Sequence, residues 1–333
     1  MLTLGCIGAG FWGKNLIRNF DGLPDVNLKW VSDLNDDNLK KIAANFPKVK
    51  TTKNVNDIFN DKEVDAVVIA TQSPTHYEIA KGALNKGKHV FVEKPLTLKV
   101  EHAEELIELA DKKNVKLMVG HLLEYHPCVQ YLKDKIRNGE FGKIYYMYTQ
   151  RVNLGIFRKN ENALWSLAPH DISVILYLFG DLPNSVSARG QNYLPTNVED
   201  VSFVNFYFKD NKMASIHASW LDPHKIRQIT LVGEKQMAVF DDVATSDKVK
   251  VFTKTVVSSD FEDYKDFLTI NWGDTIIPHI ENQEPLSIEC QHFVDSIQND
   301  TRPRSDGEDG LRVVKLLNLA QQSMDKNGKP FDL

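Results

Sequence analysis

A glycine-rich loop near the start of the chain limits the possible folds most strongly. Gly8, Gly10 and Gly13 directly follow an apolar run at residues 2–7 and precede a segment with helical periodicity at 14–20. In this context the first glycine permits a tight turn, the second lets backbone approach a pyrophosphate, and the third allows close packing of helix on strand. The pattern predicts a Rossmann βαβ unit that holds a dinucleotide at the helix N-terminus.

Asp33 adds a second part of the same fingerprint. It ends the next strand-like run, about twenty positions after the loop, where a carboxylate accepts hydrogen bonds from the adenosine ribose hydroxyls. Because that carboxylate repels a 2′-phosphate and no arginine is adjacent, the pattern favours NAD over NADP, although Lys40 and Lys41 are close in sequence. Phe11 and Trp12, inside the loop, are expected to contact the cofactor. The alternative is a glycine turn that binds nothing, or binds FAD or another nucleotide.

The first part of the chain alternates short apolar runs with amphipathic segments. Runs typical of strands occupy residues 2–7, 28–32, 66–70, 89–92 and 116–119. Helical periodicity appears between them, at residues 14–20, 36–45, 75–86 and 100–113. This alternation indicates a parallel sheet with helices on both faces. We therefore expect an α/β fold whose N-terminal Rossmann NAD-binding domain spans residues 1–120.

The pattern changes after residue 120. Helices are predicted at residues 127–138, 169–178, 284–298 and 309–326, the second one opening on Pro169, which suits a first helical turn. Strands are predicted at residues 143–152, 185–189, 201–208, 213–219, 227–232, 237–240 and 248–252. Because these strands follow one another without helices between them, we expect a C-terminal α+β domain at residues 121–333 with a large, mostly antiparallel sheet.

Composition excludes several other classes of protein. With 333 residues the chain exceeds one ordinary hydrophobic core, so two domains are expected. Its 42% hydrophobic and 26% charged residues are typical of a globular protein, and no run approaches a membrane span. A net charge of -5 gives no reason to expect nucleic acid or an anionic membrane as a partner. Three cysteines far apart in sequence, and an N-terminus without a signal segment, lead us to expect a reducing, cytoplasmic setting.

Two further segments follow strands of the predicted parallel sheet. One carries four expected cofactor contacts, Thr71, Ser73, Pro74 and His76, and the next is Glu93-Lys94-Pro95. Ligands of an open α/β sheet bind beyond the carboxyl ends of its strands, so both segments are expected to face the nicotinamide. With Pro169-His170-Asp171, they make the chain resemble, over essentially its whole length, the Gfo/Idh/MocA family of sugar and inositol dehydrogenases.

The resemblance implies two catalytic residues. In the family the lysine of Glu-Lys-Pro lies near the nicotinamide and the reacting carbinol, which implies this role for Lys94, and the bond before the proline is often cis. His170 matches the family's histidine base, which takes the hydroxyl proton. Ser166 stands where many members carry a second catalytic carboxylate, so His170 is expected to act with Lys94 alone or with a group such as Asp171 or Tyr148. A place near the N-terminus of its predicted helix would keep the imidazole neutral. The alternatives are an exposed lysine and a histidine that packs or caps.

The predicted second domain carries basic and aromatic residues near that histidine. The residues assigned to substrate binding are Arg151, Asn153, Arg158, Trp165, Ser166, His170 and Lys225. Arginine suits bidentate recognition of phosphate, and tryptophan stacks on a base or a sugar face. These segments resemble the branch of the family that oxidises UDP-N-acetylhexosamines or their uronates at C3, so a nucleotide sugar is the expected substrate. The alternative places the arginines in solvent and Trp165 and Trp220 in the core.

Three other functions stay open at this point: a free-sugar or inositol dehydrogenase, an NAD-dependent glycosidase, and a non-enzymatic NAD-sensing regulator. No metal is expected, because no set of three ligands shares a helix or hairpin in the sequence. His121 and Glu124 lie in a stretch that looks like the family's cofactor-side linker, with packing or surface positions as the alternative. An exposed apolar face of the second-domain sheet is expected to pair subunits into a homodimer or homotetramer.

Overall fold

The computed structural model describes residues 1–155, 157, 161–194, 198–259 and 267–333. Two units can be distinguished within them, Met1–Tyr125 with Gln283–Lys315, and His126–Asn282 with Leu316–Leu333. These units differ from the predicted division in two respects: the first boundary follows Tyr125 and not residue 120, and residues 283–315 pack with the N-terminal unit. No helix among the described residues combines the length and the apolar character needed to cross a membrane.

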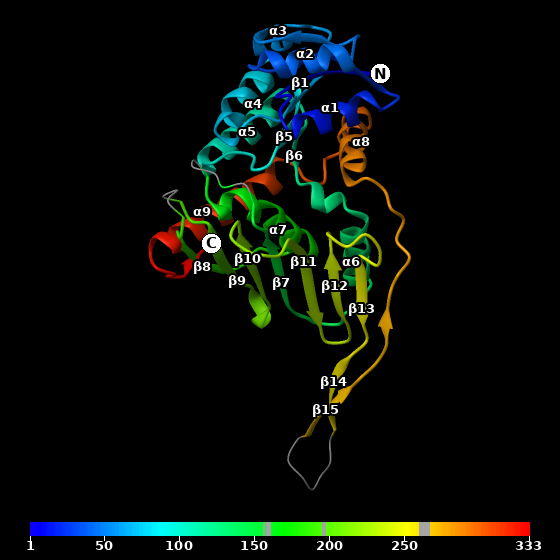
Figure 1. The fold of residues 1–333 in the computed structure, drawn as a ribbon, viewed down its shortest axis with the longest axis vertical. Coiled ribbons are helices and arrows are strands. Elements are labelled where there is room, and N and C mark those ends of the chain that lie inside the picture. Colours follow the sequence, from blue (N-terminus) through cyan, green and yellow to red (C-terminus); the bar gives the residue numbers. More distant parts are fainter. Residues whose placement is uncertain (156, 158–160, 195–197, 260–266) are drawn as a thin grey trace. The chain divides into compact units, whose positions relative to one another are not determined.

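A six-stranded parallel sheet forms the centre of the first unit (Figure 1). Its strands are β1 (Leu2–Ile7), β2 (Val26–Ser32), β3 (Lys50–Thr52), β4 (Ala66–Ile69), β5 (His89–Glu93) and β6 (Leu117–Gly120). They lie in the order β3-β2-β1-β4-β5-β6, and all neighbours are parallel. The strand order reverses at β1, which is where an open sheet of this kind binds its ligand. The predicted Rossmann architecture is confirmed.

Helices cover both faces of this sheet, so its strands are buried on both sides. One face packs against α1 (Gly13–Asp21), α2 (Asp36–Asn45) and α8 (Pro285–Gln298). The other packs against α3 (Val55–Phe59), α4 (His76–Asn85), α5 (Val100–Lys113) and the first half of α9 (Gly307–Asp325). The short 3-10 turns η1 (Ser73–Thr75) and η2 (Leu122–Tyr125) follow two of the strands. Burial on both faces explains why these strands appear in the sequence as continuous apolar runs.

A nine-stranded sheet forms the centre of the second unit. Its strands are β7 (Ile144–Val152), β8 (Ser185–Gln191), β9 (Val201–Tyr207), β10 (Met213–Ser219), β11 (Ile226–Gly233), β12 (Met237–Asp241), β13 (Val249–Phe252), β16 (Thr275–Ile276) and β17 (Phe331–Asp332). Their order is β16-β13-β12-β11-β7-β10-β9-β8-β17. Only β7 and β10 pair in parallel, so the predicted mostly antiparallel sheet is confirmed. A separate pair, β14 (Thr255–Ser259) and β15 (Phe267–Asn271), was not predicted.

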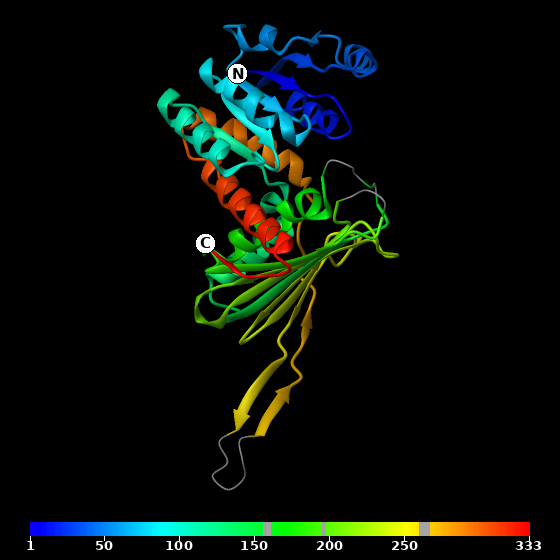
Figure 2. The ribbon, with the colours of Figure 1, turned by 90° about the vertical axis from the view of Figure 1, so that its left-hand side faces the viewer.

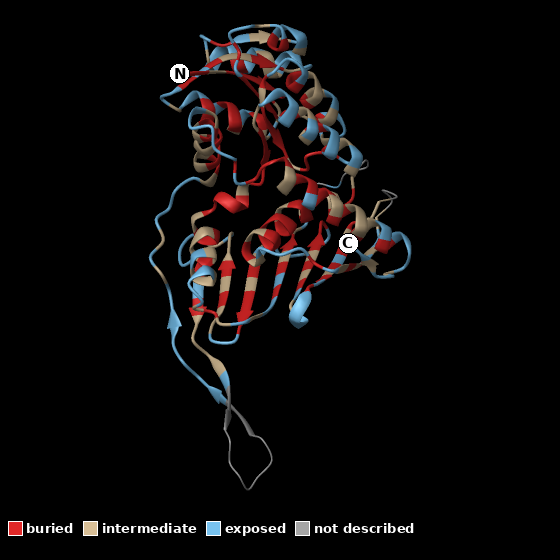
Figure 3. Cartoon of the chain, turned by 180° about the vertical axis from the view of Figure 1, so that it is seen from behind, coloured by how far each residue is buried: buried red, intermediate tan, exposed pale blue. Residues whose placement is uncertain are grey.

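One face of the nine-stranded sheet is covered and the other is open. Helices α6 (Pro127–Arg137) and α7 (Ala163–Phe179) lie on the covered face with the second half of α9 (Figure 2). The short turn η3 (Lys209–Asn211) links β9 to β10. Strand residues alternate between buried and more exposed positions (Figure 3). The open face carries the exposed side chains of Tyr146, Tyr148, Phe203 and Tyr207.

Helix α7 begins earlier than predicted. The sequence suggested a start at Pro169, but the helix starts at Ala163, and the Asn162 side chain caps it by accepting a hydrogen bond from the Trp165 N–H at 3.0 Å. Pro169 therefore lies inside the helix, and His170 lies two turns from its start. Because the helix dipole acts mainly within the first turn, the predicted influence of the N-terminus on His170 is wrong.

Candidate cofactor and active site

The glycine loop has the backbone geometry that a phosphate-binding turn requires. Gly8 has a φ of 97°, and a Cβ there would lie 2.6 Å from the Ala70 carbonyl oxygen. A Cβ at Gly13 would lie 2.0 Å from the Gly8 carbonyl oxygen, so only glycine lets α1 begin so close to β1. At Gly10, by contrast, a Cβ would meet no described atom within 4 Å. The loop thus leaves open space at Gly10, beside the N-terminus of α1, where a pyrophosphate fits.

Asp33 braces this loop from the end of β2. Its Oδ2 accepts a hydrogen bond from the Ala9 N–H at 2.7 Å, and its Oδ1 accepts one from the Asn35 N–H at 2.8 Å. Each carboxylate oxygen has a second lone pair, so both can still accept from ribose hydroxyls. Phe11, at the tip of the loop, is 84% exposed. The residues present therefore fit the adenosine and pyrophosphate parts of NAD.

Trp12 and Glu93 join the glycine loop to the Glu-Lys-Pro segment. The Trp12 indole Nε1 donates to Glu93 Oε1 at 2.5 Å, and the Lys94 backbone N–H donates to Glu93 Oε2 at 3.3 Å. Glu93 is buried, and burial raises the pKa of its carboxyl while the Trp12 hydrogen bond opposes that rise. The sequence predicted both residues as cofactor contacts. In the structure they bond to each other, which holds the segment that carries Lys94 next to the phosphate loop.

His76 holds the two other predicted loops together. Its Nδ1 lies 2.8 Å from the Pro95 carbonyl oxygen and its Nε2 lies 3.2 Å from the Thr71 carbonyl oxygen, and the ring is buried. The Lys94–Pro95 peptide bond is cis, as the family resemblance implied. The nearby Ser73 and Pro74 lie in η1, half-buried and exposed respectively, and Lys94 is half-buried. The first unit therefore brings all the predicted cofactor residues to the carboxyl edge of its sheet, with His76 facing inward.

In the second unit, α7 carries His170 and Ser166 on one face, because they are four residues apart in a helix. Ser166 is buried and His170 is half-buried. The carboxylate of Asp171, the next residue, binds Arg151. Arg151 Nε lies 2.7 Å from Asp171 Oδ2, and Arg151 Nη2 lies 3.4 Å from Asp171 Oδ1. Both members of this pair are buried. Arg151, expected to bind substrate, thus uses its guanidinium inside the unit.

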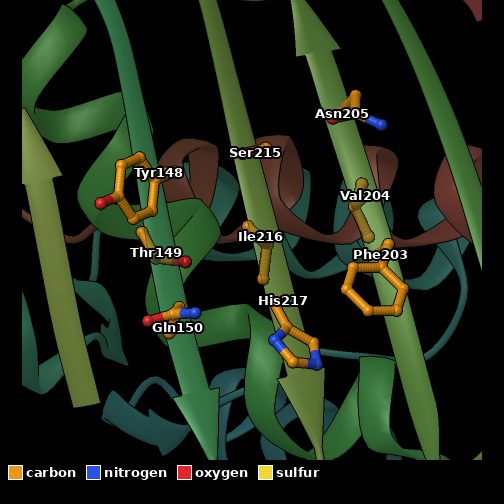
Figure 4. A pocket seen from close by; sticks show the side chains of 9 residues that line it. All are labelled: Tyr148, Thr149, Gln150, Phe203, Val204, Asn205, Ser215, Ile216 and His217. Carbon is orange, nitrogen blue, oxygen red and sulfur yellow. The ribbon is translucent and has the colours of Figure 1, made fainter. Parts of the chain in front are cut away.

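The Arg151–Asp171 pair also reduces the number of groups that could act in place of a carboxylate at Ser166. Asp171 is committed to Arg151. Tyr148 projects from the open face of the sheet, whereas α7 covers the opposite face (Figure 4). Neither group is therefore placed to assist His170 within this unit, and Lys94 is the remaining partner that the sequence suggested.

The other predicted substrate residues are only partly gathered. Asn153, half-buried, follows β7, and its backbone N–H donates to the Ser219 carbonyl oxygen at 3.1 Å. Trp165 is half-buried on α7, Lys225 is exposed, and Trp220 is in the core at 2% exposure, so the core alternative holds for Trp220. Arg158 lies outside the described residues.

Arg227 was not among the predicted contacts. It lies on β11, directly opposite Arg151 on β7, and sequence spacing does not reveal such a cross-strand neighbour.

A hollow on the open face of the nine-stranded sheet is separate from these residues. It has a volume of about 300 Å³. Its lining consists of Tyr148, Thr149, Gln150, Phe203, Val204, Asn205, Ser215, Ile216 and His217 (Figure 4). Because α7 and His170 are on the covered face, this hollow is not the candidate active site. Its exposed aromatic and polar side chains resemble a contact surface more than a catalytic pocket.

Comparison with known proteins agrees with this geometry. Residues 2–121 match a family model described as an oxidoreductase family with an NAD-binding Rossmann fold, and residues 129–239 match the GFO/IDH/MocA C-terminal domain. The UDP-N-acetylglucosamine 3-dehydrogenase of Acidithiobacillus ferrooxidans is 28% identical over 72% of this chain and 74% of that protein. The scyllo-inositol 2-dehydrogenase (NAD(+)) of Bacillus subtilis is 27% identical over 100% of this chain and 95% of that protein. The solved structure of GnnA, the UDP-N-acetylglucosamine 3-dehydrogenase from Acidithiobacillus ferrooxidans, has a TM-score of 0.84 at 23% identity and covers 98% of both chains.

Proposed function

Because the chain belongs to the Gfo/Idh/MocA family of oxidoreductases, with an NAD-binding Rossmann domain, we propose that it oxidises a sugar hydroxyl to a ketone. More narrowly, we propose that the hydroxyl is at C3 of a UDP-N-acetylhexosamine or its uronate. The observation that carries the proposal is the Trp12–Glu93 hydrogen bond, which joins the phosphate loop to the segment bearing Lys94. The likeness to the UDP-N-acetylglucosamine 3-dehydrogenase supports the narrower substrate.

Each candidate catalytic residue has a defined task in this proposal. NAD, when bound, supplies the nicotinamide that accepts the hydride. Lys94, following β5, is proposed to hydrogen-bond the reacting hydroxyl, and His170 is proposed to take its proton on an imidazole nitrogen. The Arg151–Asp171 pair supports the assignment of the base to His170, because the Asp171 carboxylate is already held by Arg151.

A dehydrogenase of inositol is the second candidate function. The scyllo-inositol 2-dehydrogenase resembles this chain over its full length. The burial of Arg151 with Asp171 also leaves fewer basic side chains for a diphosphate than the sequence suggested. The two candidates differ in substrate and share the proposed roles of Lys94 and His170.

The experiment that separates them follows NADH absorbance while the protein is given UDP-N-acetylhexosamines, their uronates, free hexoses and inositols. Turnover of the UDP-sugars supports the narrower proposal, and turnover of inositol alone contradicts it. A glycosidase would cleave glycosides without net NADH, and a regulator would bind NAD without turnover.

Variants test the roles of the two residues. Lys94→Ala and His170→Ala are each expected to abolish turnover while NAD binding, measured by calorimetry, persists. Lys86→Ala and His224→Ala change an exposed lysine of the first unit and an exposed histidine of the second, and should keep full activity. Normal turnover in Lys94→Ala or His170→Ala would refute the role of that residue.

We also propose that the protein forms a homodimer or homotetramer through the open face of the nine-stranded sheet. The exposed aromatic side chains of Tyr146, Tyr148, Phe203 and Tyr207 support this interface. A cytoplasmic location is supported by Cys6, Cys128 and Cys290, which are buried free thiols.

A further inference from the structure

A buried group of ionisable side chains lies in the first unit, where the chain leaves β6. His121 follows the strand, Glu124 lies in η2, and Asp309 lies in the first turn of α9. His121 Nδ1 is 2.6 Å from Asp309 Oδ2 and 3.5 Å from Glu124 Oε1. One ligand atom from each of the three residues lies within 4.8 Å of the other two. The side chains of His121 and Glu124 are 0% and 1% exposed, and that of Asp309 is 13% exposed. None of them has a task in the proposed reaction.

Glu289 is a further buried carboxylate of the first unit. It lies on α8, which packs against η2, and it is fully buried. Burial, and then the charge of Glu93, raise the pKa of its carboxyl, while the charge of His121 opposes that rise and that of Glu124 adds to it. Among the described residues, neither of its carboxylate oxygens has a hydrogen-bond partner, and neither has Nε2 of His121. A buried charged carboxylate without a partner is costly, and proteins meet that cost by protonating it, by pairing it or by binding a cation.

We propose that His121, Glu124 and Asp309 bind one divalent transition-metal ion, with Glu289 completing the site directly or through a bound water. One imidazole nitrogen with carboxylate oxygens suits ions such as Zn²⁺ and Mn²⁺, whereas Mg²⁺ and Ca²⁺ favour all-oxygen sites. The ion has a structural role, because its ligands come from the end of β6, from η2 and from the start of α9. This inference does not depend on the proposed function. It departs from the expectation of no metal, which considered only ligands close together in the sequence.

The test measures metal binding by the full chain, with any purification tag removed. The protein is first dialysed against a chelator, and then titrated with Zn²⁺, Mn²⁺ and Co²⁺. We expect one ion per chain by elemental analysis and a higher melting temperature in its presence. Bound Co²⁺ should also show visible absorption of a nitrogen- and oxygen-coordinated ion. Asp309→Asn and Glu289→Gln preserve shape and should weaken binding by about tenfold or more.

Glu284→Gln is the matched control, because Glu284 is a carboxylate of the first unit that pairs with Arg18 outside this group. It should bind the ion as the wild-type protein does. The proposal is overturned if the wild-type protein binds no stoichiometric ion. It is also overturned if Asp309→Asn and Glu289→Gln bind the ion as tightly as the control does. Because the ion stoichiometry and the Co²⁺ spectrum are measured on the wild-type protein, the proposal can still be tested when a variant fails to fold.

Discussion

At the scale of single residues, two carboxylates fix the glycine loop from opposite ends. Asp33, at the end of β2, accepts a hydrogen bond from the Ala9 N–H, and Glu93, at the end of β5, accepts one from the Trp12 indole. Both residues therefore shape the loop before any cofactor arrives. Asp33 differs from Glu93 in being half-buried, so its remaining lone pairs can reach a ribose.

Asp33→Ala is expected to weaken NAD binding by roughly tenfold to a hundredfold, because hydrogen bonds to a charged acceptor contribute about 1.5–3 kcal/mol. NADP should lose less, since the carboxylate no longer repels its 2′-phosphate. Calorimetric titration of both cofactors measures the two affinities. Asp36→Ala is the control, because Asp36 is an exposed carboxylate on α2 that pairs with Lys53. It should change neither the NAD affinity nor the NADP affinity. An unchanged ratio of NAD to NADP affinity in Asp33→Ala would count against the ribose contact.

At the scale of elements, the cap of α7 positions the face that carries Ser166 and His170. The Asn162 side chain accepts from the Trp165 N–H, and its Nδ2 donates to Glu199 Oε2 and to Gln321 Oε1, both at 2.8 Å. Asn162 is buried, so these partners lose their donor if it is truncated.

Asn162→Ala should lower the free energy of unfolding of the second unit by about 1–2 kcal/mol or somewhat more, the upper range for an N-cap. Urea unfolding followed by circular dichroism measures the loss. Asn35→Ala offers a matched comparison, because Asn35 caps α2 at an exposed position by accepting from the Asp37 N–H. It should cost less than Asn162→Ala, and an equal cost would show that the buried partners contribute nothing.

The junction of β5 and β6 predicts a dependence of stability on pH. His89 Nδ1 accepts a hydrogen bond from the Lys116 N–H at 2.9 Å, which requires a neutral ring. Burial, and then the charge of Lys116, lower the pKa of His89 below its ordinary value of 6.5. The unfolded chain therefore binds a proton more readily than the folded one, and stability should fall as pH drops below about 6.5.

Urea unfolding between about pH 8 and about pH 5.5 measures this fall. His89→Asn retains an acceptor oxygen without titrating, so its stability should depend less on pH than that of the wild-type protein. His224→Asn changes an exposed histidine of the second unit and should follow the wild-type profile. Parallel profiles for wild type and His89→Asn would contradict the prediction.

Local signals in the sequence predicted most helices and strands, whereas contacts between residues far apart in the chain could not be predicted from it. The strand at Leu2–Ile7 and the helix at Val100–Lys113 have the predicted bounds, because periodicity and neighbouring turn residues define them. The glycine loop was also predicted from the sequence, because its three glycines lie within six residues of one another. The Trp12–Glu93 bond spans 81 positions and the His121–Asp309 contact spans 188, so no spacing rule reveals them. Even the 20 positions between Arg151 and Asp171 hid a pairing that changed the expected substrate site.

At the scale of the whole molecule, the open sheet face is the surface expected to join subunits. Phe203 on β9, 50% exposed, stacks on His217 of the neighbouring strand β10 with ring centroids 4.3 Å apart on that face. Phe203→Glu would place a charge in the interface and should yield a monomer by light scattering after size-exclusion chromatography. Leu34→Glu alters a side chain of the first unit that is 84% exposed, and should leave the assembly intact. A wild-type monomer, or an unchanged oligomer in Phe203→Glu, would contradict the interface.

Helix α8 has a consequence for how the protein is made. Its Phe293 packs edge-on against Phe20 and Phe91, with ring centroids 6.2 and 5.7 Å apart, although it follows them by most of the chain. On the ribosome, the nucleotide-binding half therefore cannot close its core when its own six strands have emerged. The nascent chain must keep Phe20 and Phe91 partly uncovered until residues 283–315 leave the exit tunnel, after the whole nine-stranded sheet apart from its last short strand has been synthesised. Chaperone capture during that interval should concentrate on the N-terminal half.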